Sequence, residues 1–401
     1  YAARLRTNYP HLNNANCVGD FQGSLSNRGE RIALAKPDLV VTTNATGRVE
    51  TNVAHIVVSE VTYADGGRWG QWADGGGSSL ELIDPRADLL RPSNWADSDE
   101  TSKAPWTTVE TTGRIDNSSG SANRLHVASL GGGECLVDDI EVFRAGSTNV
   151  VNNGDFENGQ TGWVFSGNHS TSTVDTTGAA SGTRCLHVRG QGDGDTGPNT
   201  LRNTLRTSLA NNSTVTIRAK VRWLAGWPQI LFRLHGNGLE LAANMAVPPN
   251  LGTPGLPNSR LVANAGPAIY DVAHAPPLPA ANEPVRVTCR VSDPDRLAQV
   301  QLRYRIDPSS TLSTVIMRDD GAQGDERAGD GLFSAILPAQ SAGTLAAFRI
   351  TATDAGTPAA SATFPARAPA EECLVRWGDA IPFGTFAHYH LWFTRATANA
   401  R

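Results

Sequence analysis

The segment Val215-Thr-Ile-Arg-Ala-Lys-Val-Arg-Trp223 alternates apolar and polar side chains. Because successive side chains on a β-strand point to opposite faces, this alternation predicts a strand with one face in a core and the other in solvent. Similar runs, bounded by Gly, Asn, Asp and Pro, recur at 55–63, 136–143 and 285–291, whereas helix-period segments are almost absent. The sequence therefore predicts an all-β protein made of consecutive β-sandwiches.

The length of 401 residues predicts two to four domains at about 150 residues each. Proline-rich stretches at 247–257 and 275–279 are typical of extended linkers. Placing boundaries at these and weaker breaks, we expect three β-domains and a short tail, over 1–103, 104–259, 260–368 and 369–401.

Charge and cysteine content exclude several classes of protein. The formal net charge is −5 and the chain has no basic run, which argues against a nucleic-acid partner held by phosphate contacts. The sequence contains no run of 18 apolar residues, so no membrane-spanning helix is expected. The five cysteines form no Cys-x-x-Cys pair, so a zinc or thioredoxin-type site is not expected. The chain starts at Tyr1 without a signal peptide, and we interpret it as a piece of a longer protein.

Three motifs in the first domain follow one another in a familiar order: Gly23-Ser-Leu-Ser-Asn-Arg-Gly-Glu30, Val61-Thr-Tyr63 and Asp74-Gly-Gly-Gly-Ser-Ser-Leu-Glu-Leu82. They resemble the bacterial lamin-tail domain, an immunoglobulin-like sandwich. The resemblance implies a non-catalytic extracellular module. The expected core residues are Leu25, Ile32, Leu34, Leu80, Leu82 and Ile83.

The second domain carries two motifs in reversed order. Asn152-Asn-Gly-Asp-Phe-Glu157 and the following Trp163 resemble the opening strand of carbohydrate-binding jelly rolls. Cys135-Leu-Val-Asp-Asp-Ile-Glu-Val-Phe143 resembles their closing strand but comes first. We therefore expect a circularly permuted jelly roll, in which these two segments lie side by side.

In the relatives of this jelly roll, the opening and closing motifs often hold a structural calcium ion, which takes six to eight oxygen ligands. The resemblance makes four acidic residues candidate ligands, although they could instead cap turns: Asp138, Asp139, Asp155 and Glu157. Cys135 and Cys185 both lie in this domain, and a disulfide between them is expected to bring their Cα atoms within 7 Å.

Sugar binding uses an aromatic face against the apolar side of a sugar ring, together with a few fixed polar groups. The second domain offers both, although Trp223 falls in an alternating strand and could belong to the core. The candidate carbohydrate-binding residues are Trp163, Trp223, Trp227, Arg233, His235, Asn237 and Glu240.

The third domain resembles Ig-like or fibronectin-like sandwiches that carry Val-Ser-Asp-Pro-Asp, here 291–295, and a late Ala-Thr-Asp, here 352–354. Its most acidic loop interleaves acids with glycine and could wrap a calcium ion, although the spacing departs from an EF-hand and a glycine-rich hairpin with solvated acids is an alternative. The acids are Asp319, Asp320, Asp325 and Asp330.

From Glu371 the sequence resembles the entry strands of a CotH-like secretory kinase domain, without the glycine loop, lysine or metal-binding aspartate of a kinase. We expect the chain to be a non-catalytic, extracellular or cell-surface part of a larger secreted bacterial protein that binds polysaccharide or surface matrix. The alternatives are a self-associating subunit of an extracellular filament or surface layer, and the N-terminal part of a CotH-like kinase.

Overall fold

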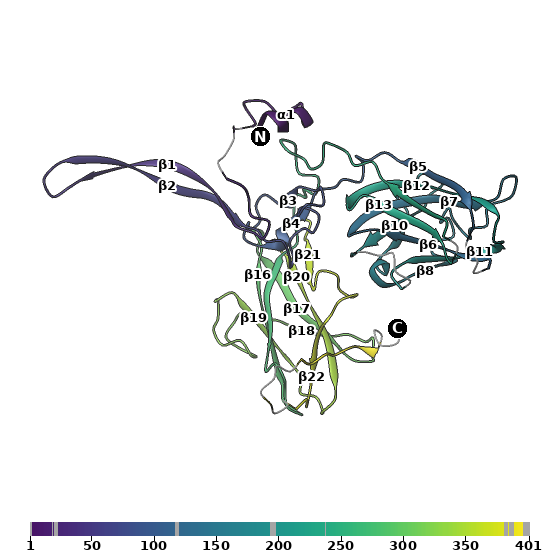
Figure 1. Cartoon of the computed structure of the whole chain (residues 1–401). Coiled ribbons are helices and arrows are strands. Elements are labelled where there is room, and N and C mark those ends of the chain that lie inside the picture. Colours follow the sequence, from purple (N-terminus) through teal and green to yellow (C-terminus); the bar gives the residue numbers. More distant parts are fainter. Residues whose placement is uncertain are drawn as a thin grey trace. The chain divides into compact units, whose positions relative to one another are not determined.

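The computed structural model describes residues 2–17, 19, 23–116, 120–192, 198–236, 238–380, 384 and 389–395. Nearly all of its regular structure is antiparallel β-sheet, which confirms the predicted fold class (Figure 1). The helices are α1 (Ala2–Asn8) and the 3-10 turns η1 (Pro92–Asn94) and η2 (Gly167–His169). None of them has the length and apolar character that crossing a membrane requires. The chain forms two compact units, over 1–28, 70–81 and 97–260, and over 29–69, 82–96 and 261–401.

The first unit contains a sandwich of two five-stranded sheets. One, named here the β7 sheet, has the order β5-β12-β7-β10-β9, with bounds Thr107–Arg114, Thr214–Gly226, Gly133–Phe143, Cys185–Gly190 and Thr173–Asp175. The other, the β6 sheet, has the order β14-β13-β6-β11-β8, with bounds Glu240–Asn244, Gln229–Leu234, Ala122–Ser129, Leu201–Leu209 and Trp163–Phe165.

Strand β12 shows how the sequence pattern produces this sandwich. Val215, Ile217 and Trp223 are at most 1% exposed and belong to the core between the sheets, while Arg218 and Lys220 lie on the outer face. Burying each such aliphatic side chain contributes about 1.5–3 kcal/mol relative to leaving it exposed. The alternation in the sequence therefore decides which side of the strand faces the core.

The two motifs expected to be neighbours in a permuted jelly roll are adjacent. Strand β7 pairs with β12 and β10, and its Ile140 N–H donates to the carbonyl of Gly154 at 2.9 Å. Val150 N–H donates to the carbonyl of Val142, also at 2.9 Å. The segment that precedes Asp155 thus runs along the strand that carries Asp138 and Asp139, as predicted.

The second unit contains a sheet of order β15-β16-β19 and a sheet of order β18-β17-β20-β21, in which β22 also pairs with β20. Their bounds are Ala268–Ala275, Val285–Ser292 and Leu332–Leu337, and then Ser313–Ile316, Leu297–Ile306, Leu345–Asp354, Ser361–Phe364 and Cys373–Arg376.

Strand β22 belongs to the part of the chain that we expected to be a separate tail. It pairs with β20 from Leu345↔Arg376 to Phe348↔Cys373, and Trp377 is fully buried, with its indole N–H donating to the carbonyl of Glu283 at 2.7 Å. The domain boundary expected at 368 therefore does not hold in the structure, because residues after it complete the sheet and fill its core.

The self-contained sandwich expected over 1–103 is not found among the described residues. Strands β1 (Arg31–Thr43) and β2 (Val49–Thr62) form a two-stranded hairpin (Figure 1), and β3 (Leu80–Leu82) pairs with β4 (Trp95–Asp97). The expected core residues Leu25 and Leu34 are 53% and 68% exposed. Apolar side chains on both faces of the hairpin remain uncovered, because no sheet of the described chain packs on either face.

The proline-rich stretch 247–257 is not a free linker. Lys103 donates its ammonium to the carbonyl of Gly252, and the N–H of Gly252 donates to Glu100 at 2.9 Å. The hydroxyl of Tyr9 donates to the carbonyl of Leu251. The stretch is therefore held against other segments of the first unit by polar contacts that its composition does not reveal.

Candidate functional site

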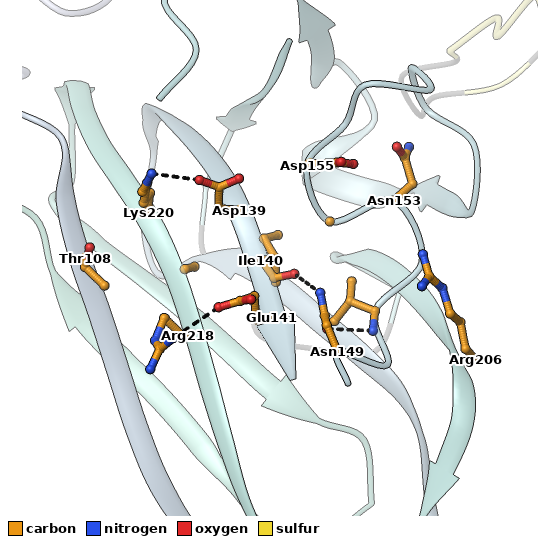
Figure 2. A pocket seen from close by; sticks show the side chains of 13 residues that line it. Thr108, Asp139, Ile140, Glu141, Asn149, Asn153, Asp155, Arg206, Arg218 and Lys220 are labelled. Carbon is orange, nitrogen blue, oxygen red and sulfur yellow. Dashed lines mark hydrogen bonds and ion pairs between the residues drawn. The ribbon is translucent and has the colours of Figure 1, made fainter. Parts of the chain in front are cut away.

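The outer face of the β7 sheet carries a polar pocket of about 440 Å³ (Figure 2). Thr108 of β5, Arg218 and Lys220 of β12, and Asp139 and Glu141 of β7 line one side of it. The loop 149–155 and Arg206 of β11 close the other side. The β-bulge at Asp139, where φ is 48°, lets both Asp138 and Asp139 leave the core side of the sheet.

Charged groups in this pocket are mostly paired with one another. The carboxylate of Asp139 forms an ion pair with the ammonium of Lys220 at 2.8 Å and accepts a hydrogen bond from the hydroxyl of Ser181 at 2.7 Å. Burial alone would raise the pKa of Asp139, but these two contacts outweigh it and lower the pKa. Arg218 donates to Glu110 at 2.5 Å and to Glu141 at 3.3 Å.

Asp155 differs from the other acids, because no described residue pairs with its exposed carboxylate at the pocket rim. With no aromatic side chain in its lining, the pocket is suited to hydrogen-bonding hydroxyl groups rather than to stacking on a ring.

The four calcium candidates of this region are largely committed to other partners. Asp138 is fully buried and accepts the N–H groups of Asp139, Ala180 and Ser181 at 2.8, 2.9 and 3.1 Å. Glu157 accepts from Thr183 and Arg184 at 2.7–2.9 Å. Since N–H groups and the Lys220 ammonium occupy oxygens that an ion would need, these contacts match the alternative in which the acids cap turns.

The acidic loop of the second unit brings carboxylates together. In the described part of the chain, oxygens of Asp319, Asp325 and Asp330 lie within 4.8 Å of one another. Asp325 is 7% exposed and its carboxylate accepts a hydrogen bond from the N–H of Gly321 at 2.6 Å. The carboxylate of Asp320 instead accepts a hydrogen bond from the guanidinium of Arg318 at 3.1 Å. Asp319 also accepts the N–H groups of Asp330 and Gly331 at 3.1 and 3.0 Å, as expected for the alternative of a glycine-rich hairpin. The spacing of the three carboxylates is nevertheless short enough for them to share a hard cation.

Two of the predicted sugar platforms are core residues. Trp163 and Trp223 are 5% and 1% exposed, and their indole N–H groups donate to the carbonyls of Asn153 and Gly226 at 3.1 and 3.0 Å. For Trp223 the alternation of β12 already indicated this burial. Neither side chain offers a face to a ligand in this structure.

Trp227 is the predicted platform that remains accessible, with 51% of its surface exposed. It follows β12, and its indole N–H donates to the side-chain oxygen of Gln229 at 3.1 Å. The amide of Gln229 in turn donates to Asn244 at 2.8 Å. An exposed indole beside two ordered amides is the combination that sugar recognition requires.

Three more of the predicted residues lie at or near the end of β13 and β14 that is opposite to Gln229 and Asn244. Arg233 donates to Glu240 at 2.6 Å across β13 and β14. The His235 ring stacks on His126 of β6, with centroids 4.8 Å apart. Asn237 lies outside the described residues. His126 was missed in the sequence, although Leu125 and Val127 are core residues and the strand period puts His126 on the outer face with Arg233.

The predicted Cys135–Cys185 disulfide is wrong for this structure, in which both thiols are free and buried. Cys135 lies opposite Val188, three residues from Cys185, and the odd offset puts the two side chains on opposite faces of the β7 sheet. Three residues of strand span about 10 Å, beyond the reach of a disulfide. Burial raises the pKa of Cys185 to about 12.

Comparison with known proteins gives two family matches. Residues 148–244 match a carbohydrate binding domain, and residues 281–360 match the second Ig-like domain of conditioned medium factor. No curated protein matches the chain. A solved DUF4785 family protein from Legionella pneumophila covers 69% of the chain at 6% identity and a TM-score of 0.21, and the chain spans 62% of that protein. The first unit's sandwich is thus similar to carbohydrate-binding domains, and the second unit's to an Ig-like domain, which fits a binding role.

Proposed function

We propose that this chain is a non-catalytic, extracellular binding region of a larger secreted bacterial protein, and that the first unit's sandwich binds polysaccharide. The match of residues 148–244 to a carbohydrate binding domain carries the proposal. The exposed Trp227 with Gln229 and Asn244 supplies an aromatic face and fixed amides for a sugar ring. The lamin-tail and CotH-like resemblances motivate the proposed location outside the cell.

A polysaccharide array tests this function. The intact chain is expected to bind at least one polysaccharide, and Trp227→Ala is expected to weaken that binding about tenfold or more, because stacking on the indole is lost. Arg114→Gln is the control, since Arg114 is exposed on β5 and lies opposite Thr214, at the end of β12 that is remote from Trp227. Absence of binding to every polysaccharide would reject the function.

We also propose calcium for the acidic loop of the second unit. Asp319, Asp325 and Asp330 are the candidate ligands, because their oxygens already lie within 4.8 Å of one another. Titration calorimetry with calcium should detect binding that Asp325→Asn removes. Asp320→Asn should leave calcium binding unchanged, since the carboxylate of Asp320 is hydrogen-bonded to Arg318 instead. Equal binding by both variants would contradict this ligand set.

The second candidate function is self-association, as in a filament or surface layer. It is favoured by the β1–β2 hairpin, whose side chains Leu39, Val41 and Val53 are 68%, 63% and 54% exposed. A two-stranded hairpin without a covering layer is marginally stable in water. Light scattering at increasing protein concentration distinguishes this candidate, because a polymer subunit would grow in mass whereas a monomeric binding module would not.

A further inference from the structure

A row of arginine and histidine side chains crosses the outer face of the β6 sheet. The strand register places Arg202 of β11 opposite His126 of β6, and His126 opposite Arg233 of β13. Arg233 in turn lies opposite Glu240 of β14. Side chains directly opposite each other on one face have Cβ atoms about 4.5–5.5 Å apart. Two arginines therefore flank one histidine across three adjacent strands.

A second row adds positive charge beside the first. Arg124 lies two residues before His126 on the same face of β6, and the N–H of His235 donates to the carbonyl of Arg124 at 3.1 Å. Glu240 is paired with Arg233 at 2.6 Å, whereas no carboxylate in the described part of the chain pairs with Arg202 or Arg124. Arg202 and Arg124 therefore leave positive charge on this face that no carboxylate of the described residues compensates, and an anionic ligand would neutralise it.

The surroundings of His126 show how positive this region is. Burial, followed by the nearby His235, Arg202, Arg124 and Arg233, lowers the pKa of His126 to about 4. The ring is therefore neutral near pH 7. The positive charge of this face at neutral pH therefore comes from its arginines and not from His126.

Two polar atoms in this row lack partners. His126 is 7% exposed, and its Nε2 is buried without a hydrogen bond among the described residues. The Nε of Arg202 is in the same situation. A buried polar atom without a partner costs about 1–3 kcal/mol.

We propose that the outer face of the β6 sheet binds an anionic polysaccharide, with Arg202 and Arg124 holding its acidic groups. Guanidinium groups match carboxylate and sulfate oxygens in charge and in planar geometry. Uronic acids and sulfate esters share this chemistry. The inference rests on the proposed carbohydrate-binding function and specifies its ligand class.

The same face continues toward Trp227. Gln229 lies opposite Asn244, and Arg233 is four positions after Gln229 on β13. At about 3.3 Å per residue this is about 13 Å, longer than one sugar ring. A polysaccharide can therefore place a ring at Trp227 and an acidic group at the arginines. The chain's net charge of −5 favours this local contact over a nucleic acid, which requires an extended basic surface.

Titration calorimetry with polygalacturonate, dextran sulfate, neutral dextran and the RNA homopolymer poly(U) tests the proposal on the intact chain. We expect binding to one or both acidic polysaccharides, weakened by added salt, and at least tenfold weaker affinity for Arg202→Gln and for Arg124→Gln. Arg114→Gln, a matched change on the exposed part of β5 in the other sheet, should alter affinity less than twofold. Binding of polygalacturonate would indicate recognition of uronic acids, and binding of dextran sulfate would indicate recognition of sulfate esters.

Four results overturn the inference. Equal affinity of Arg202→Gln, Arg124→Gln and the unmodified chain would show that the arginines do not contact the ligand. Tighter binding of poly(U) than of either acidic polysaccharide would assign the face to nucleic acid. Binding of neutral dextran alone would reject the anionic ligand while the proposed function stands, whereas no binding to any of the three polysaccharides, together with a silent array, would reject both. Circular dichroism of both variants checks that they are folded.

Discussion

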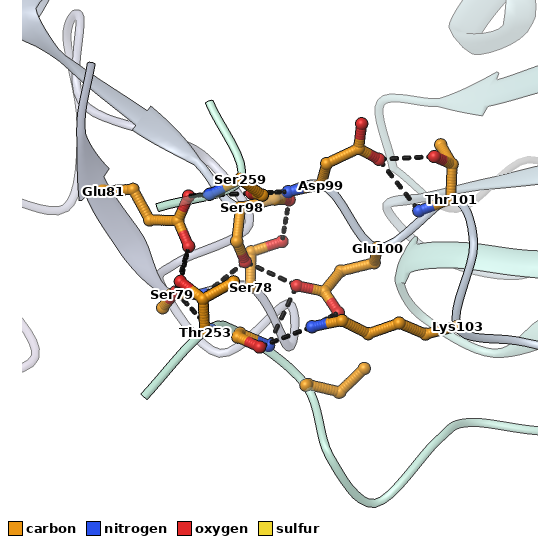
Figure 3. A network of polar contacts seen from close by, with 12 residues as sticks. Ser78, Ser79, Glu81, Ser98, Asp99, Glu100, Thr101, Lys103, Thr253 and Ser259 are labelled. Carbon is orange, nitrogen blue, oxygen red and sulfur yellow. Dashed lines mark hydrogen bonds and ion pairs between the residues drawn. The ribbon is translucent and has the colours of Figure 1, made fainter. Parts of the chain in front are cut away.

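Glu81 accepts both the backbone N–H and the hydroxyl of Ser259, at 2.7 and 2.8 Å, so two segments far apart in sequence meet at one buried carboxylate (Figure 3). The hydroxyl of Thr253 also donates to Glu81, which is 3% exposed. The neighbouring Glu100 accepts Ser98 and Lys103 at 2.5 and 2.9 Å. This network gives the Ser-Leu-Glu-Leu motif a structural role within the first unit.

Glu81→Gln should lower the free energy of unfolding of the first unit by about 1–3 kcal/mol, because a buried carboxylate that accepts several hydrogen bonds is replaced by a group that accepts fewer. Urea unfolding followed by tryptophan fluorescence measures the change. Glu110→Gln is the control, since its ion pair with Arg218 lies on the surface and should contribute less than about 1 kcal/mol. An equal effect of the two variants would contradict the role of Glu81.

Acid should weaken the same network. Burial would raise the pKa of Glu81, but the hydrogen bonds from Thr253, Ser259 and Arg260 outweigh it and lower the pKa below 4.5. A carboxylate whose pKa is lower in the folded state stabilises the protein above pH 4.5 and loses that contribution as the pH falls through its folded pKa. Unfolding curves between pH 6 and pH 3 should show this loss, and Glu81→Gln should reduce it.

His126 should produce a separate pH dependence. Its pKa is about 4 in the folded chain against 6.5 for an unperturbed histidine, so the unfolded chain binds the proton first as the pH falls. The free energy of unfolding should therefore decrease from about pH 6.5 to about pH 4. In His126→Gln this component should disappear, while that of His169, whose pKa burial also lowers, remains. An unchanged pH profile in the variant would contradict the assignment.

Truncation of Trp223 should affect stability, whereas truncation of Trp227 should affect ligand binding. Trp223→Ala removes a core side chain and should cost about 3–5 kcal/mol of stability. Trp227→Ala should change stability by about 0.5 kcal/mol or less and act on polysaccharide binding instead. Thermal unfolding and calorimetry of each variant separate the two effects.

The cysteines should behave as buried thiols. Alkylation in urea without a reductant should label both Cys135 and Cys185, and reductant should leave the melting temperature unchanged. Under native conditions labelling should be slow, because the thiols are buried and burial raises their pKa values. Recovery of a linked peptide by mass spectrometry would contradict the free-thiol state.

Local patterning was sufficient for the class of fold and for much of its core. The alternation at 215–223 predicted a strand whose core face includes Val215 and Ile217, and the reversed order of two motifs predicted that β7 and the segment before Asp155 are neighbours. These predictions succeed because strand period and motif content are properties of short segments.

The tertiary structure decided the rest, because pairing between distant segments does not appear in any local pattern. Only the folded chain brings Ser259 to Glu81 and adds β22 to β20, and only there does the β1–β2 hairpin stand without a covering sheet among the described residues. Register likewise separated Cys135 from Cys185 and aligned Arg202, His126 and Arg233 in one row. A shift of one residue along a strand would send each of these side chains to the opposite face, so the sequence alone determined the strands while long-range pairing determined the surface they present.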